Sequence, residues 1–79
     1  MINYLLNGLT IKQNRIMAFI ESFIGSNGFA PSLREIGESF HIAPSSALDH
    51  LKALEKKGYI RRIHSKSRCL KILRRNMAT

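Results

Sequence analysis

The residues of this 79-residue chain that are best suited to chemistry are its cations, and most of them lie near one end of the sequence. Nine of the thirteen Lys and Arg residues lie from residue 56 onward, where the sequence contains no Asp or Glu. These nine are Lys56, Lys57, Arg61, Arg62, Lys66, Arg68, Lys71, Arg74 and Arg75. Positive charge without compensating acids attracts polyanions and contacts phosphate groups. This region, together with a formal net charge of +8, predicts an anionic partner; the alternative is a basic surface that only faces solvent.

Patterns typical of catalysis or metal binding are absent from the sequence. His41, His50 and His64 have no Cys or carboxylate at the spacing of metal ligands. There is no phosphate-binding glycine loop, nucleophile elbow or obvious acid pair. The single cysteine, Cys69, allows no disulfide within these residues and is expected to fill a strand position in the core. We therefore expect a protein that is not an enzyme and that needs no cofactor and no metal.

The apolar segments are too short for a membrane-spanning helix, which needs ~20 consecutive apolar residues. The first eight residues, MINYLLNG, carry no Lys or Arg before their apolar residues and do not resemble a signal peptide. A single cysteine also fits a reducing compartment. The expected location is the cytoplasm, without a membrane partner.

The first expected helix runs from Thr10 to about Gly25. Thr10 and Gln13 have the spacing of a capping box, in which the side chain of each residue accepts from the backbone N–H of the other. Apolar residues then recur at helical spacing, and the sequence GSNG at residues 25–28 is expected to end the helix. Residues 29–31 end in a proline, and the residue before a proline avoids the helical region. This segment is therefore expected to be extended and is a candidate third strand of a small sheet.

The second expected helix is short and covers residues 33–40. Ser32 and Glu35 form a second capping box at its start. Gly37 is expected to let a neighbouring helix pack closely. Residues 41–43 are predicted to form a tight turn to the next helix.

The third expected helix covers residues 44–57. Pro44 suits the first helical position, where its missing N–H would be unpaired anyway. Ser46 and Asp49 offer a competing start, because they too have the spacing of a capping box. Gly58 suits the position that follows the end of a helix. The predicted buried face carries Ala47, Leu51 and Leu54.

Two β-prone runs follow, at residues 59–64 and 69–73. The residues SKSR between them, 65–68, are expected to link the two strands as a hairpin. The apolar residues do not alternate regularly, so a bulge or bend near Arg61–Arg62 is expected. We call residues 59–73 the wing.

A short capped helix, a tight turn, a second amphipathic helix and a hairpin form the pattern of a winged helix-turn-helix. The expected fold class is mainly α with a small antiparallel β wing. We expect an N-terminal extension at residues 1–8, the three-helix domain at 9–73 and a basic tail at 74–79. Because such a module places the start of its second helix in the major groove, double-stranded DNA is the predicted partner.

Outward side chains near the start of the third helix are the candidates for reading bases. They are Ser45, Ser46, Leu48, Asp49 and Lys52. Serine hydroxyls bond bases or phosphates, an apolar group contacts a thymine methyl, and a carboxylate accepts from a cytosine amine. In the alternative reading, the serines and Asp49 cap the helix. Leu48 would then pack against the second helix or a partner copy.

A set of cations around this helix is expected to contact phosphates. The set comprises Lys52, Lys56, Arg61, Arg62, Lys66, Arg68 and Lys71. Such contacts fix the register of a protein on DNA without reading its sequence. Lys66 and Arg68, at the expected tip of the wing, are also candidates for the minor groove.

Four stretches resemble the N-terminal DNA-binding domain of LexA repressors: LTIKQ from residue 9, GFAPSLREIGE from 28, HLKALEKKGYI from 50 and SRCLKIL from 67. The resemblance covers about residues 9–73. It implies a winged helix-turn-helix protein that represses genes of the DNA-damage (SOS) response by binding palindromic operators as a dimer. By position, Ala43, Ser45, Ser46, Leu48 and Asp49 fall where that family places its base-contacting residues.

The sequence also departs from that family's pattern. The connection at residues 41–43 is one residue shorter than the usual family loop, and the reading residues differ, so the family's operator does not transfer. LexA proteins carry a C-terminal self-cleaving peptidase domain that also dimerises them, and these residues contain no counterpart. Self-cleavage is therefore not assigned to these residues, and we expect a monomer or weak homodimer, paired on inverted-repeat DNA.

Two other classes of function compete with a transcriptional regulator. The first is a winged helix that serves as a protein-interaction or accessory module, suggested by Leu48 and by the apolar lead-in Ile2, Tyr4, Leu5 and Leu6. The second is nonspecific nucleic-acid binding driven by charge alone. Comparing specific with random duplexes over a range of salt distinguishes all three.

Overall fold

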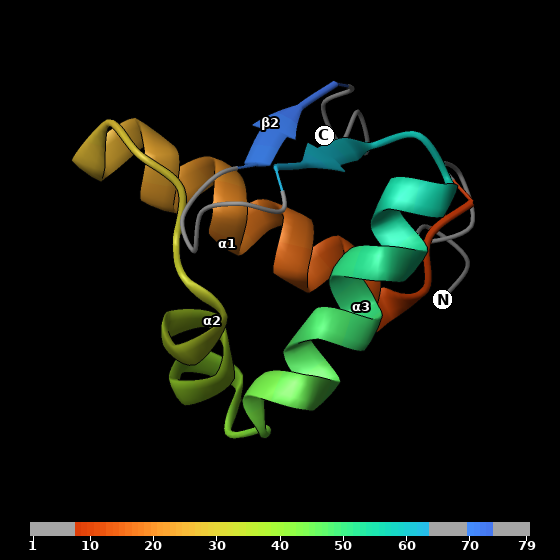
Figure 1. Cartoon of the computed structure of the whole chain (residues 1–79), viewed down its shortest axis with the longest axis horizontal. Coiled ribbons are helices and arrows are strands. Elements are labelled where there is room, and N and C mark those ends of the chain that lie inside the picture. Colours follow the sequence, from red (N-terminus) through yellow and green to blue (C-terminus); the bar gives the residue numbers. More distant parts are fainter. Residues whose placement is uncertain (1–7, 64–69, 74–79) are drawn as a thin grey trace.

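The computed structural model describes residues 8–63 and 70–73 of the chain (Figure 1). Three helices precede a two-stranded antiparallel sheet in the described part. The elements are α1 (Ile11–Asn27), α2 (Leu33–Phe40), α3 (Pro44–Lys56), β1 (Ile60–Arg62) and β2 (Leu70–Ile72). This mainly helical order confirms the predicted fold class, a winged helix-turn-helix.

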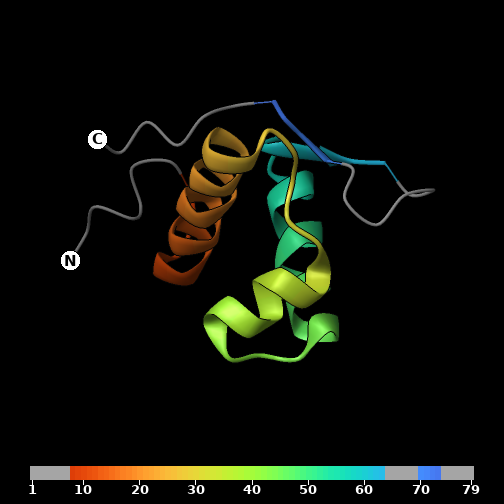
Figure 2. The ribbon, with the colours of Figure 1, turned by 90° about the vertical axis from the view of Figure 1, so that its left-hand side faces the viewer.

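Helix α3 is the centre of the arrangement, because α1, α2 and β1 all pack against it. The small sheet lies at one end of the molecule and α2 lies at the other (Figures 1 and 2). The buried core joins α1, α2, α3 and β1 and comprises Leu9, Ile16, Met17, Ile20, Ile36, Ala47, Leu51, Leu54, Tyr59 and Ile60. The predicted inner face of the third helix is thus confirmed.

Helix α1 begins as predicted but ends later. The Thr10 Oγ1 accepts from the Gln13 N–H at 3.1 Å, and the Gln13 Oε1 accepts from the Thr10 N–H at 3.1 Å. The predicted stop at residues 25–28 is confirmed, although the helix continues to Asn27, two residues beyond the expected end near Gly25. Gly28 ends it with φ of 81°, a left-handed conformation that glycine adopts without steric cost. Gly25 stays helical on an exposed turn.

The predicted third strand at residues 29–31 is wrong. The described sheet has two strands, β1 and β2, and this segment is instead a connection between α1 and α2. Ala30 and Pro31 are buried in it. Since proline has no N–H to donate to a strand ladder, the segment is poorly suited to pairing.

Helix α2 has the predicted bounds and the predicted capping box between Ser32 and Glu35. Gly37 does permit a close approach, but the neighbour is the following turn. A Cβ at this position would lie 2.6 Å from the backbone oxygen of Ile42. The Ile42 N–H also donates to the Gly37 oxygen at 2.9 Å. His41 completes the reversal with φ of 58°.

Helix α3 begins at Pro44, and the competing start at Ser46 is wrong. Its N-cap is Ala43, which makes no side-chain cap hydrogen bond. The helix ends at Lys56, one residue before the predicted end. Gly58 then adopts φ of 85° and donates to Glu55, while Tyr59 donates to Leu54, both at 3.0 Å. These two bonds form a Schellman motif, which turns the chain directly into β1.

The sheet is regular where the sequence predicts a bulge. Ile60 lies opposite Ile72, Arg61 opposite Lys71 and Arg62 opposite Leu70, so no residue is extra. The bulge near Arg61–Arg62 is therefore wrong. The irregular apolar pattern is accommodated by exposure instead, because Ile63 and Leu73 are 40% and 55% exposed. The predicted link at residues 65–68 lies outside the described residues.

Candidate nucleic-acid interface

One face of α3 is buried and the opposite face is polar and exposed. Ser45, Asp49, Lys52 and Lys56 follow one another at spacings of four, three and four residues, and all four are exposed. This spacing places them in one stripe along the helix, because 3.6 residues make a turn. The stripe carries hydroxyl, carboxylate and ammonium groups along a helix of 13 residues.

The five predicted base-reading residues lie together at the start of α3. Ala43, Ser45 and Asp49 are exposed, whereas Ser46 and Leu48 are half-buried. The alternative reading, in which Ser45, Ser46 or Asp49 caps the helix, does not match the structure, because the N-cap is Ala43. The half-burial of Leu48 agrees with partial packing of its side chain on the protein.

The backbone between α2 and α3 fixes the direction of this stripe. Gly37 and Ile42 are in contact through the main chain, and Pro44 lies directly beyond them. Backbone atoms cannot move aside by changing a side-chain rotamer. This contact therefore restricts rotation of α3 relative to α2. The five predicted base-reading residues therefore sit on a closely joined pair of helices.

Two cations of the wing form an exposed cross-strand pair. Arg61 lies directly opposite Lys71 on the outer face of the sheet, and both are exposed. Like charges directly opposite one another destabilise a sheet. An anion that binds both side chains removes this repulsion. A phosphate bound by this pair would therefore relieve a repulsion between Arg61 and Lys71.

Arg62 differs from its neighbours, because its side chain points toward α3. The Arg62 Nε donates to the Glu55 Oε1 at 2.9 Å, and the Arg62 backbone N–H donates to the Glu55 Oε2 at 3.3 Å. The Arg62 side chain is only 19% exposed. The structure thus separates Arg62 from the outward cations with which the sequence grouped it.

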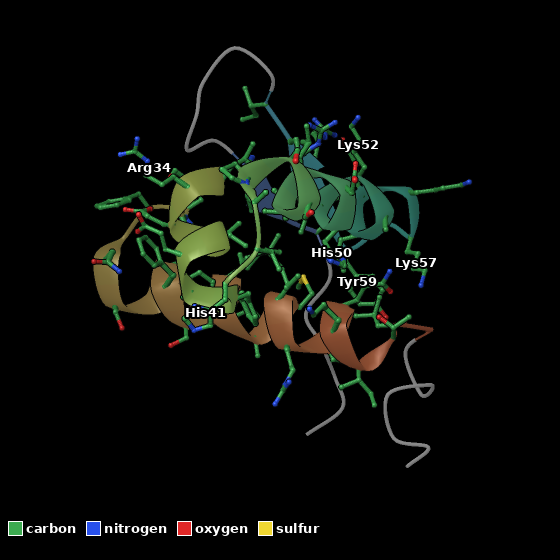
Figure 3. The ribbon with its side chains drawn as sticks, turned by 90° about the horizontal axis from the view of Figure 1, so that it is seen from below. Arg34, His41, His50, Lys52, Lys57 and Tyr59 are labelled. Atoms are coloured by element: carbon green, nitrogen blue, oxygen red, sulfur yellow. The ribbon has the colours of Figure 1, made fainter. Side chains whose placement is uncertain are left out.

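The remaining predicted phosphate-binding residues divide into two groups. Lys52 and Lys56 are exposed on the stripe of α3, whereas Lys66 and Arg68 lie outside the described residues. Lys57, next to Lys56, projects instead toward α1 (Figure 3). Its Nζ donates to the Gly8 oxygen and to the Gln13 Oε1, both at 2.7 Å. Lys57 therefore links the end of α3 to the start of α1.

Arg34 is a cation that the sequence analysis did not include. It is exposed in the first turn of α2. Figure 3 shows Arg34 and Lys52 projecting from α2 and α3 toward the same side of the molecule. Its position in the sequence could have indicated a phosphate contact, because the first helix of a helix-turn-helix crosses the DNA backbone.

The histidines do not gather into a metal site in the described part of the chain. No group of three or more His, Cys, Asp or Glu side chains there is placed to hold a metal ion. His41 lies in the turn before α3, while His50 projects from α3 toward α1 (Figure 3). Within the same residues, no helix is long and apolar enough to cross a membrane.

Comparison with known proteins agrees with this arrangement. A family model described as LexA DNA binding domain matches residues 6–69. The LexA repressor of Thermotoga maritima is 55% identical over 64 residues, which are 81% of this chain and 32% of that protein. The LexA repressor of Leptospira interrogans is 46% identical over 68 residues, 86% of this chain and 34% of that protein. The chain thus spans about a third of the length of the curated relatives that it matches, and it belongs to the LexA DNA-binding domain family.

Proposed function

We propose that this chain binds double-stranded DNA in a sequence-specific manner and acts as a LexA-like transcriptional repressor in the cytoplasm. The observation that carries the proposal is the exposed polar stripe of α3, fixed by its contact with α2 and lying beside outward cations. The relatives at 46–55% identity are named LexA repressors, which supports the same function.

The start of α3 enters the major groove in this proposal. That groove is about 12 Å wide and admits one helix. The exposed hydroxyl of Ser45 is placed to bond a base edge or a phosphate, and the Asp49 carboxylate to accept from a cytosine amine. Ala43, Ser46 and Leu48 complete the surface, with Leu48 placed to contact a thymine methyl by the exposed part of its side chain.

In the same proposal, a set of cations contacts the phosphates of the DNA backbone. The proposed set comprises Arg34, Lys52, Lys56, Arg61, Lys66, Arg68 and Lys71. It adds Arg34 and omits Arg62, whose guanidinium bonds Glu55. Binding of these cations releases counterions from the DNA. Because that release is less favourable at high salt, we expect binding to weaken as the salt concentration rises.

The experiment that tests this function is selection from a pool of random duplexes, followed by titration of the selected duplex and of random DNA. We expect a sequence with the symmetry of an inverted repeat to be enriched and to bind at least ~10³-fold more tightly than random DNA. Equal affinity for both duplexes at every salt concentration would instead establish nonspecific binding by charge.

We further propose that the chain is a monomer or weak homodimer that pairs on inverted-repeat DNA. A single small module buries only ~600–1,000 Å² on DNA, so two copies on neighbouring half-sites bind more firmly than one. Sedimentation of the free protein and titration of half-sites and full sites test this. A stable dimer without DNA would contradict it, as would equally tight binding to an isolated half-site.

A further inference from the structure

One carboxylate joins the end of β1 to the end of α3. Glu55 lies in the last turn of α3, and its two oxygens accept from the side chain and from the backbone of Arg62. Arg62 is the last residue of β1. The wing is also anchored by the buried Tyr59 and Ile60, and Leu70 and Ile72 of β2 pack against the same core.

The pattern of the strand ladder explains why this backbone N–H is available to Glu55. The N–H of Leu73, the residue directly after β2, donates to the Tyr59 oxygen at 2.8 Å. Tyr59 and Leu73 are therefore at a hydrogen-bonding position of the ladder. In an antiparallel pair, bonding and non-bonding positions alternate. With Arg61 opposite Lys71, the N–H of Arg62 points away from β2. Glu55 accepts it and so covers the open edge of β1.

Alternation also determines which side chains face α3. Ile60 and Arg62 lie on the inner side of β1, whereas Arg61 and its partner Lys71 lie on the outer side. A rotation of the distal strand would break both bonds to Glu55 and would redirect Arg61 and Lys71 together. The direction of the outward cations is thus coupled to the Glu55–Arg62 contact.

We propose that Glu55 and Arg62 are a positioning pair that sets the direction of the wing relative to α3. The consequence for DNA rests on the function proposed above: the outward cations reach the phosphates while α3 occupies the groove. Glu55 then strengthens DNA binding although its charge has the same sign as DNA, and Arg62 contributes without touching a phosphate.

The decisive variant is Glu55→Gln in the full chain, because charge and positioning predict opposite results. Removing an acid raises the net charge by one and, through charge alone, strengthens binding to every duplex. Loss of positioning weakens binding to the duplex selected by the unaltered chain, by about 2- to 5-fold. Binding to random duplex is expected to weaken as well, because the outward cations contact phosphates of any sequence. Equal or tighter binding to the selected duplex overturns the proposal.

Arg62→Gln and the neighbouring control Arg61→Ala distinguish positioning from phosphate contact. Arg62→Gln is expected to weaken binding to the selected duplex and to leave the slope of log affinity against log salt unchanged. Arg61→Ala reduces that slope by about 1. In the double variant Glu55→Gln with Arg62→Gln, the second change adds little to the first. A slope reduced by about 1 in Arg62→Gln makes Arg62 a phosphate contact and overturns the proposal.

A measurement without DNA separates this proposal from the proposed function. Residual dipolar couplings of the Arg62, Leu70 and Lys71 amides report the orientation of the strands relative to α3. In Glu55→Gln we expect these couplings to change while those of α3 persist and the melting temperature changes little. Unchanged couplings overturn the positioning role, whether or not any duplex is selected. Failure to select a duplex overturns only the DNA-binding function.

Discussion

The turn between α2 and α3 and the base of the wing both border the exposed stripe of α3, but different forces hold them. At the turn, backbone meets backbone: Gly37 lies so close to the Ile42 oxygen that a Cβ would approach it to 2.6 Å. At the wing, side chains meet side chains: Leu70 and Ile72 pack against the core, and a partly exposed ion pair joins Glu55 to Arg62. Main-chain contact leaves no alternative arrangement, whereas a partly exposed ion pair contributes only about 0–1 kcal/mol.

This difference matches the two tasks of the proposed interface. Reading bases requires side chains held in one place, and α3 receives that from the turn and from its buried face. Phosphate contact tolerates small movements, because a charge acts over several ångströms. Specificity is therefore expected from the helix pair, and affinity from the outward cations of the wing.

Leu54→Ala should give the largest effect, because it loosens both regions at once. Leu54 is fully buried on the inner face of α3, so its side chain cannot contact DNA directly. Truncating a buried leucine costs about 2–5 kcal/mol. We expect a large fall in the melting temperature measured by circular dichroism. Lys52→Ala on the exposed face is the matched control and should leave stability nearly unchanged.

Gly37→Ala should damage the turn specifically. The new methyl group would meet the Ile42 backbone oxygen, which cannot rotate away, so we expect a loss of about 1–3 kcal/mol in the free energy of unfolding. Specific DNA binding should fall more than nonspecific binding, because α3 shifts relative to α2.

Gly25→Ala is the control for that substitution, since it makes the same chemical change in a helix. No atom lies within 4 Å of its Cβ position. Alanine favours a helix over glycine by about 1 kcal/mol, so the chain should become more stable. Equal effects of the two substitutions would show that the close contact at Gly37 does not restrain the turn.

The features predicted correctly from sequence are those that neighbouring residues determine. The capping boxes at Thr10 and Ser32 depend on residues three positions apart, and both formed. The stripe of α3 follows from helical spacing alone. Gly25 and Gly28 could not be ranked in this way, because both are compatible with a helix end and only the packing of α1 decides between them.

The features that sequence did not predict depend on the assembled fold. Arg61 and Arg62 are identical in type and adjacent, yet one faces outward and the other bonds Glu55. Which one does so depends on the reversal at Gly58, which brings β1 back beside the end of α3. Arg34 likewise joins the cationic surface only because α2 and α3 present it on the same side as Lys52 (Figure 3).

Arg61→Ala and Lys71→Ala should weaken DNA binding without weakening the fold. Each removes one proposed phosphate contact, so affinity should fall similarly for selected and random duplexes and the salt slope should decrease by about 1. The melting temperature should stay the same or rise slightly, because the variant loses a like-charge pair across the strands. A changed preferred sequence would show that the residue reads a groove and would blur the division between helix and wing.

His41→Gly should give the smallest effect, and it tests whether the turn carries strain. His41 is the only residue other than glycine with positive φ in the described part of the chain, at 58°. A left-handed conformation costs a residue with a side chain roughly 1–2 kcal/mol. Replacement by glycine removes this cost, but it also stabilises the unfolded state, because glycine has more conformational freedom there. We therefore expect a net stabilisation of up to about 1 kcal/mol in denaturant unfolding. Gly58→Ala makes the opposite change at φ of 85°, where no atom lies within 4 Å of the Cβ position, and should destabilise by a similar amount. A loss of stability in His41→Gly would mean that the imidazole contributes more to the turn than its conformation costs.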